Sequence, residues 1–364
     1  MSNLKEIAKR TGVAVSTVSL VLNGRSSAVR ISEATRSRVL ETARQIGYTP
    51  NVAARRLRAG GTARAEPVLA LLAPIDARFS LISRVVTGVR DYLSRATVAA
   101  GYESEAEPEL LIETYLPGQL GRHRSLLSNH RAHGVIVVNS TPEDDAFLEA
   151  NDLAVPIVLF QRRSRHSYVQ VDNAGSGRAV ASHLLDSGYQ HFAVLVPSMP
   201  SAAFNERRDG FLAALTEAGV DPAHVSMASG NFSEEGGAAA MEEILARRAV
   251  RLPQPPLGVF ALTDAMAIGA MYGARVAGLR VPEDVGFVGH DDLEVSAYVE
   301  PPLSSVHTPR AEMAGRAAGI LLDLLQRRVE PPIQEVFPSH LVVRASSERM
   351  AARTRPHPEL PDPA

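Results

Sequence analysis

The residues best placed for recognition chemistry lie at the start of a short helical segment near the N-terminus. In LKEIAKRTGVAVSTVSLVLN, residues 4–23, apolar side chains recur at helical spacing on both sides of Gly12, which can adopt the positive φ of a tight turn. Two short helices joined in this way form a helix-turn-helix, whose second helix fits the major groove of DNA. The spacing predicts base or phosphate contacts for Val15, Ser16, Thr17, Ser19 and Asn23. An ordinary helical hairpin is the alternative for this segment taken alone.

The charge distribution favours DNA binding over the hairpin. Residues 1–64 contain twelve Lys and Arg residues and three acidic residues, a net charge of +9. The rest of the chain contains 26 basic and 37 acidic residues, a net charge of −11. A cationic N-terminal unit neutralises phosphates and releases counterions, whereas an anionic body avoids nucleic acid.

Composition excludes several classes of protein. The chain has no cysteine, so disulfides, thiolate zinc sites and thiol nucleophiles are excluded. No apolar run approaches the roughly 20 residues that span a bilayer, and no signal-peptide core precedes the first helix. We therefore expect a cytoplasmic protein with no membrane partner.

The elements that must position the recognition residues come next along the chain. A third helix is predicted from Ser32, a good N-cap, to Gly47, a good C-terminal stop. Residues 51–58 can form only two helical turns before Gly60-Gly61, and a helix so short folds only when packed against DNA or a second copy.

From Pro67 onward, short apolar runs alternate with helical stretches, which predicts parallel sheets covered by helices. A first set of strands is expected to close at residues 155–160 and a second to begin at 169–171, with a late return of the chain through 303–325. The predicted fold class is an all-α helix-turn-helix head followed by an α/β body of two doubly wound parallel-sheet lobes with a cleft between them. The tail after Met350 is rich in proline and charge, has no leucine heptad and is expected to be disordered.

Fourteen short motifs are spread along residues 2–350. They are Gly12-Val13, Thr17-Val18-Ser19, Val21-Leu22-Asn23, Gly47-Tyr48, Pro50-Asn51, Ala54, Leu57, Val171-Asp172-Asn173, Arg207, Gly210-Phe211, Thr263-Asp264, Ala267-Ile268-Gly269, Val288-Gly289 and Asp291-Asp292. Each motif is weak alone, but their order and spacing are specific. Together they resemble the motifs of the lactose/galactose repressor (LacI/GalR) family of bacterial transcription regulators.

The resemblance implies a homodimer that grips a near-palindromic double-stranded operator, with hinge helices that meet over the minor groove. Leu57 matches the hinge wedge that opens a base step and bends DNA, although a simple packing contact between hinge helices is the alternative. Ala14 replaces the usual Ser cap of the recognition helix, and the connection to the third helix is longer than in the lactose repressor. Further DNA contacts are expected at Arg25, Arg30, Asn51, Ala54, Arg55, Arg56 and Arg58.

The resemblance also implies a body similar to periplasmic sugar-binding proteins, with a small polar effector between the lobes. Arg207 matches a ligand-clamping arginine whose forked donors suit hydroxyls or a carboxylate, and Asp291 follows a buried strand. A surface arginine and a loop cap are the respective alternatives. Gln161 stands where sugar-responsive members often have Asp, which argues against a standard pyranose. Looser matches to the pocket are Asp76, Phe79, Gln161 and Thr263, and His290 and His307 are expected in or beside the cleft.

An enzyme would need a constellation that this sequence lacks, so we predict no catalytic residues, no cofactor and no metal. The segment Gly175-Ser176-Gly177 opens a helix, but Val180 occupies the third fingerprint position of a dinucleotide site. There is no P-loop and no nucleophile elbow. The histidines at 123, 130 and 133 are interleaved with arginines, which favours a solvated helix face over a metal site.

Two other classes of protein remain as alternatives. A two-lobed solute-binding protein would be exported and would lack residues 1–64, and an architectural DNA-binding protein would leave the cleft without a purpose. We therefore predict an effector-responsive transcriptional regulator, most simply a repressor controlled by a sugar, with a nucleobase or nucleoside effector as the alternative. The expected domains are 1–47 for the head, 48–64 for the hinge and 65–350 for the body, with a tail at 351–364. Within the body, lobe 1 comprises about 65–160 and 309–336, and lobe 2 about 161–308 and 337–350.

Overall fold

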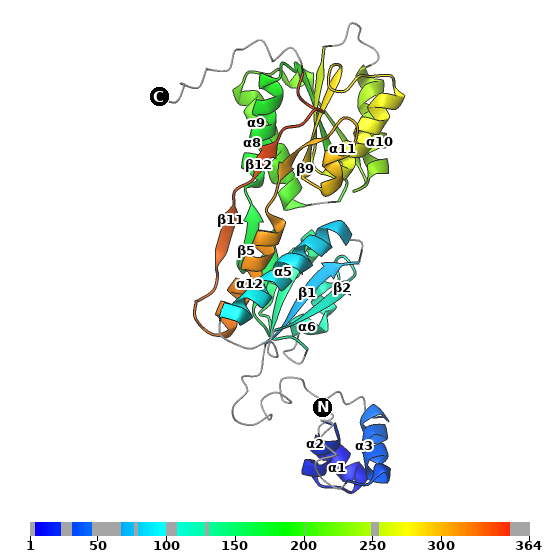
Figure 1. The fold of residues 1–364 in the computed structure, drawn as a ribbon, viewed down its shortest axis with the longest axis vertical. Coiled ribbons are helices and arrows are strands. Elements are labelled where there is room, and N and C mark those ends of the chain that lie inside the picture. Colours follow the sequence, from blue (N-terminus) through cyan, green and yellow to red (C-terminus); the bar gives the residue numbers. More distant parts are fainter. Residues whose placement is uncertain are drawn as a thin grey trace.

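The computed structural model describes residues 4–22, 31–45, 67–75, 79–99, 108–127, 131–199, 201–248 and 255–349. Three helices form an N-terminal unit, and two lobes, each built on a sheet, form the body (Figure 1). The predicted hinge at 48–64 and the tail at 351–364 lie outside the described residues. The same holds for Asn23, Arg25, Arg30, Asn51, Ala54, Arg55, Arg56, Leu57, Arg58 and Asp76.

The N-terminal unit has the predicted helix-turn-helix. Its helices are α1 (Leu4–Thr11), α2 (Val15–Leu22) and α3 (Glu33–Gln45). Gly12 takes a φ of +69°, which lets the chain turn between α1 and α2. Ile7, Val18 and Val39 are fully buried, one from each helix, so the three helices share one small core. Ser32 caps α3 as predicted, since its hydroxyl accepts a hydrogen bond from the backbone N–H of Thr35 at 3.2 Å.

Lobe 1 is centred on a six-stranded parallel sheet of order β11-β5-β4-β3-β1-β2. Its strands are β1 (Val68–Pro74), β2 (Glu109–Tyr115), β3 (Gly134–Val138), β4 (Ile157–Phe160), β5 (Ser167–Val171) and β11 (Gln334–Phe337). Its helices are α5 (Phe79–Ala99), η1 (Leu120–Arg122), α6 (Arg124–Leu127), α7 (Pro142–Ala150) and α12 (Arg310–Leu325). Buried side chains of β1, β3 and β4 pack on α5 and α12, which lie side by side on the sheet (Figure 1).

Lobe 2 repeats this architecture with the order β12-β10-β9-β8-β6-β7, in which β12 alone pairs antiparallel, to β10. Its strands are β6 (His191–Pro197), β7 (Val225–Gly230), β8 (Leu257–Ala261), β9 (Val285–Asp291), β10 (Ser304–His307) and β12 (His340–Val342). Its helices are α8 (Asn173–Asp186), α9 (Ala202–Glu217), η2 (Pro222–His224), α10 (Glu234–Arg248), α11 (Asp264–Val276) and η3 (Glu294–Ala297). Helices therefore cover both faces of each sheet, as predicted.

One part of the predicted division is wrong, because β5 belongs to lobe 1. Val158 of β4 pairs with Ser167, and Val171 pairs with Phe337 of β11, so both strands extend the first sheet. Only six residues separate β4 from β5, whereas parallel neighbours usually need a crossover of roughly a dozen or more. The sequence pattern contains no sign that this strand stays in the first sheet.

The chain passes between the lobes three times, after β5, after β10 and after β11. The first and third passages are joined, since the Asp172 N–H donates to the carbonyl of Phe337 at 3.0 Å. The second passage runs from His307 into α12 and carries the late return of the chain that the sequence predicted. In the described part of the chain, every helix is too short or too polar to cross a bilayer.

Candidate functional site

The recognition helix presents its leading end to solvent. Val15 is 41% exposed and Ser16 is exposed, whereas Val18, one turn later, is fully buried in the head. Thr17 lies between these extremes, and the side chain of Ser19 is not among those described. The two residues at the start of α2 are therefore free to meet base edges, where Val offers an apolar contact and Ser a donor or acceptor.

Arg207 lies on α9 in lobe 2, where α9 and α8 cross closely and bury its side chain. A Cβ on Gly210 would lie 2.2 Å from the carbonyl oxygen of Ala174, so only glycine permits this approach. The Arg207 side chain is 3% exposed, which excludes the surface arginine considered as the alternative. Its Nε donates to Asn173 Oδ1 at 2.9 Å and its Nη1 to the Leu262 carbonyl at 2.9 Å. Burial lowers the pKa of this guanidinium to about 10.

Asp291 ends β9 at the carboxyl edge of the second sheet, where open α/β sheets bind ligands. Its φ of +117° and the φ of +49° at Asp292 turn the backbone sharply after the strand. Arg310, the first residue of α12, makes an ion pair with Asp291 Oδ1, and His290 Nδ1 lies 3.3 Å from the same atom. Although burial opposes ionisation, the Arg310 guanidinium leads a set of cations that hold the pKa of Asp291 well below its usual range. Because Arg310 belongs to lobe 1 and Asp291 to lobe 2, this ion pair joins the lobes.

Gln161 and Thr263 are buried, and each makes hydrogen bonds to the protein backbone. Gln161 has a φ of +64°, and its Oε1 accepts a hydrogen bond from the Val171 N–H at 3.2 Å. Thr263 caps α11, with its hydroxyl accepting from the Met266 N–H at 3.3 Å. Phe79 begins α5, and its side chain is not described. Arg162, beside Gln161, is buried and donates to Ser201 Oγ at 2.8 Å, which places a further cation among these residues.

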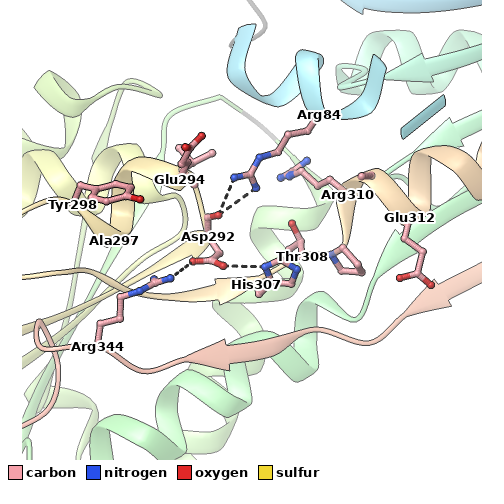
Figure 2. Close-up of a pocket in the computed structure, with 13 residues that line it drawn as sticks. Arg84, Asp292, Glu294, Ala297, Tyr298, His307, Thr308, Arg310, Glu312 and Arg344 are labelled. Carbon is pink, nitrogen blue, oxygen red and sulfur yellow. Dashed lines mark hydrogen bonds and ion pairs between the residues drawn. The ribbon is translucent and has the colours of Figure 1, made fainter. Parts of the chain in front are cut away.

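A cavity of about 520 Å³ lies where α5 and the start of α12 meet the loop after β9. Figure 2 shows Asp292 at its centre, with Arg344 and His307 holding its carboxylate from two sides at 2.8 and 2.9 Å. Arg84 from α5 donates both of its terminal amino groups to the Asp292 carbonyl at 3.2 Å. The cavity includes Arg310 but is lined by none of Gln161, Arg207, Thr263 or Asp291. These four side chains are buried, so the lobes are closed over them.

Sequence reasoning named Asp264 only as part of the Thr263-Asp264 motif and gave it no role in the site, although its carboxylate accepts three hydrogen bonds from described residues. Its carboxylate accepts from the Leu293 N–H at 2.6 Å, from Ser296 Oγ at 2.7 Å and from Ser305 Oγ. Burial, together with the nearby Asp291 charge, raises the pKa of Asp264 to about 6. The signal was present, because Asp264 directly follows a helix cap at the end of a buried strand. Arg310 gave no such signal within its own segment.

The histidine group at 123, 130 and 133 does not form the solvated helix face that was predicted. A 3-10 turn and the four-residue α6 interrupt this stretch, and residues 128–130 lie outside the description. His133 Nδ1 accepts from the Val68 N–H at 2.9 Å, and His123 lies 3.9 Å from Glu113, which pairs with Arg131 at 2.7 Å. Within the described ranges, no group of three His, Cys, Asp or Glu residues could hold a metal ion.

Comparison with known proteins agrees with this arrangement. Residues 3–51 match the family described as "Bacterial regulatory proteins, lacI family", and residues 181–347 match the "Periplasmic binding protein-like domain". The HTH-type transcriptional regulator CelR of Thermobifida fusca is 33% identical over 360 residues, which cover 94% of this chain and 97% of that protein. The chain belongs to the lacI family of bacterial regulatory proteins.

Other relatives of this regulator match at least 95% of its length. The HTH-type transcriptional repressor CytR of Escherichia coli K12 is 27% identical over 354 residues, covering 96% of this chain and 97% of CytR. A structure of the CelR–cellobiose complex has a TM-score of 0.66 and 29% identity, covering 95% of this chain and 100% of that one. The lac repressor dimer bound to operator and the anti-inducer ONPF has the same TM-score at 22% identity, covering 96% of this chain and 99% of that one, and shows the shared fold.

Proposed function

We propose that this regulator is a homodimeric repressor that binds a near-palindromic operator and is controlled by a small polar ligand held between its lobes. One observation carries the proposal: a helix-turn-helix with an exposed leading end precedes two lobes that meet at a buried cluster of charged side chains. Two heads are needed to read the two halves of a palindrome, so a dimer suffices. The protein is a binding module and has no catalytic role.

The ligand class follows from the donors in the cluster. Arg207 provides forked donors at the carboxyl edge of the second sheet, beside Asp291 and Arg310. The solved complex of CelR contains cellobiose, which supports a sugar or a related polar molecule. A nucleobase or nucleoside is the second candidate, because the Gln161 amide is bonded internally and offers no carboxylate to sugar hydroxyls.

The experiment measures DNA binding with and without ligand. An operator is first selected from random duplex DNA with the full chain, and its affinity is then followed by fluorescence anisotropy at one fixed salt concentration. Sugars, nucleobases and nucleosides are screened for compounds that change this affinity. By linkage, operator DNA must change the affinity for an active compound by the same factor.

Arg207→Ala tests the ligand site. We expect this variant to lose the effector response while its operator affinity without ligand stays within a few-fold of wild type. Arg207→Gln provides a second variant that retains polarity in the buried position, and Arg208→Ala, on the neighbouring position of α9 and partly exposed, is the matched control. An Arg207→Ala protein that responds at wild-type ligand concentrations would remove this residue from the site.

A further inference from the structure

The buried cluster between the lobes contains more cations than directly paired carboxylates. Arg162, Arg207 and Arg310 are between 3% and 7% exposed, and electrostatic interactions connect all three. Among the described residues, Arg207 has no carboxylate within ion-pair distance, since its Nε and Nη1 bind only a neutral amide and a carbonyl oxygen. A buried cation is costly unless it is paired, so this position calls for an additional anion.

Neighbouring acids are already engaged elsewhere. Asp291 Oδ1 faces both Arg310 and His290. Glu206 binds Asn173 Nδ2 at 3.2 Å and lies 3.3 Å from Arg163. Asp264 accepts hydrogen bonds from the loop after β9 and from Ser305. None of these carboxylates approaches Arg207 within ion-pair distance. The Arg207 guanidinium lies over the Phe204 ring, 5.4 Å from its centroid, so its charge has an aromatic partner within the protein but no paired anion.

Three buried polar atoms in the same region also have no partner among the described residues. They are Arg310 Nε, Thr308 Oγ1 and His290 Nε2, and the residues that bear them are at most 7% exposed. Buried donors without a partner are rare in native proteins and point to a missing ligand or water. Arg310 and Thr308 also line the 520 Å³ cavity, so a ligand entering from that side reaches them (Figure 2).

We propose that the effector is an anionic sugar derivative, whose carboxylate or phosphate binds Arg207 and Arg310 together with the Thr308 hydroxyl. This inference rests on the proposed effector site between the lobes. The ligand's anion takes the place of Asp291 as the partner of Arg310, and the released Asp291 carboxylate accepts hydrogen bonds from the ligand's hydroxyl groups. Because Arg207 belongs to lobe 2 and Arg310 to lobe 1, the bound anion links the lobes in place of the protein's own ion pair.

The test compares matched neutral and anionic ligands on the full chain by isothermal titration calorimetry. The pairs are cellobiose with cellobionate, glucose with gluconate, and glucose with glucose 6-phosphate, so that the carboxylate and phosphate arms are separate. We expect at least one anion to bind about tenfold or more tightly than its neutral partner, the ratio that one charge-assisted hydrogen bond provides. A neutral sugar that binds as tightly as its anionic partner in every pair, or a panel without any anion binding, overturns the inference.

Variants of α12 separate the role of Arg310 from folding. Arg310→Met retains most of the side-chain volume and should erase the preference for the anion, whereas Arg310→Lys retains the charge and should keep most of it. Arg316→Met is the matched control, because Arg316 lies on the same helix but pairs with Glu335. If Arg310→Met keeps the full preference, the inference is overturned.

Failure of this inference and failure of the proposed function look different. A neutral sugar or nucleoside that changes operator affinity while no anion binds leaves the regulator intact and overturns the anionic ligand. An anion that binds through Arg310 without any change in operator affinity supports the ligand class and contradicts the proposed regulation.

Discussion

Lowering the pH from 7.5 to 5 tests the environment of His290. Its ring is fully buried in β9, with Nδ1 at 3.3 Å from Asp291 Oδ1 and Nε2 without a partner among the described residues. Burial and the neighbouring Arg207 guanidinium lower the pKa of His290 to about 3. In the unfolded chain, the same ring titrates near 6.5.

The sign of the effect follows from the proton count. Below pH 6.5 the His290 ring binds a proton in the unfolded state but stays neutral in the folded state. The contribution of His290 to stability is therefore complete above pH 6.5 and is lost as the pH falls. At pH 5 the unfolded ring is 1.5 pH units below its pKa while the folded ring is still neutral. The free energy of unfolding therefore falls by about 2 kcal/mol, and it continues to fall until the folded ring titrates near pH 3.

The assay is urea unfolding of the full chain at pH 7.5 and at pH 5, followed by circular dichroism at one ionic strength. His290→Phe and His290→Asn cannot titrate and differ in volume, so each is compared with its own stability at pH 7.5. Burial also lowers the pKa values of His123 and His183, but these rings are present in every protein and cancel in the comparison. The exposed His224, changed to Asn, is the control.

We expect both His290 variants to lose about 2 kcal/mol less than wild type over this pH interval, and His224→Asn to lose as much as wild type. Equal losses in wild type and in both His290 variants would refute the argument, because the buried ring would then titrate in the folded protein as it does in the unfolded chain.

Four further predictions concern other parts of the molecule. The raised pKa of Asp264 acts in the opposite direction, because the folded carboxyl keeps its proton up to about pH 6 and stability is therefore lost as the pH rises. Between pH 3.8 and pH 7, urea unfolding should show a loss of about 2.5 kcal/mol in wild type that is absent in Asp264→Asn. Gly210→Ala should lower the free energy of unfolding by about 1–3 kcal/mol or more, because its Cβ would press on the Ala174 carbonyl, whereas the exposed Asp209→Ala on the same helix should have little effect in the same urea titration. Sedimentation equilibrium should show a dimer, as the tail offers no heptad to join two dimers, and a stable tetramer would contradict this. Leu57→Ala should weaken operator binding far more than binding to random DNA in anisotropy titrations, since a wedge acts only where DNA bends, and equal losses on both would show that Leu57 is no wedge.

The helices of the head and the alternation of strands and helices in the body could be predicted because their signals are local. Gly12 between two apolar helical patterns and Ser32 before α3 each specify structure within a few residues. The partner of a strand is not a local property. The composition of residues 167–171 suits a strand in either sheet. Only their pairing assigns them to lobe 1, with β4 on one side and, on the other, with β11, which lies more than 160 residues away in the sequence.

The candidate site was predictable to the same extent. Arg207 was predicted because it matches a ligand-clamping arginine of the family, and Asp291 because it follows a buried strand. Both side chains are buried, and their role in ligand binding stays a prediction. Arg310 was missed because its importance depends on Asp291, which lies 19 residues earlier and in the other lobe. The helix predicted for the histidines between 123 and 133 was wrong because residues 131–133 are not helical and lead into β3, where His133 Nδ1 accepts a hydrogen bond from the Val68 N–H.

The end of β9 is where a ligand can influence the rest of the body. Arg84 of α5 and Arg310 of α12 both reach across from lobe 1 to this point, one to the Asp292 carbonyl and one to the Asp291 carboxylate. Helices α5 and α12 pack against each other, so a displacement of either helix at these contacts also displaces the other. A ligand shifts the equilibrium between lobe arrangements only by its difference in affinity for them. Exchange of one or two charge-assisted hydrogen bonds at Asp291 supplies about 1–3 kcal/mol, which corresponds to a change of roughly 5- to 150-fold in the affinity of a second site. In the described part of the chain, β1 and α5 are the first elements of the body that follow the head. The difference in ligand affinity between the two lobe arrangements therefore acts on the part of lobe 1 that is nearest in sequence to the DNA-binding helices.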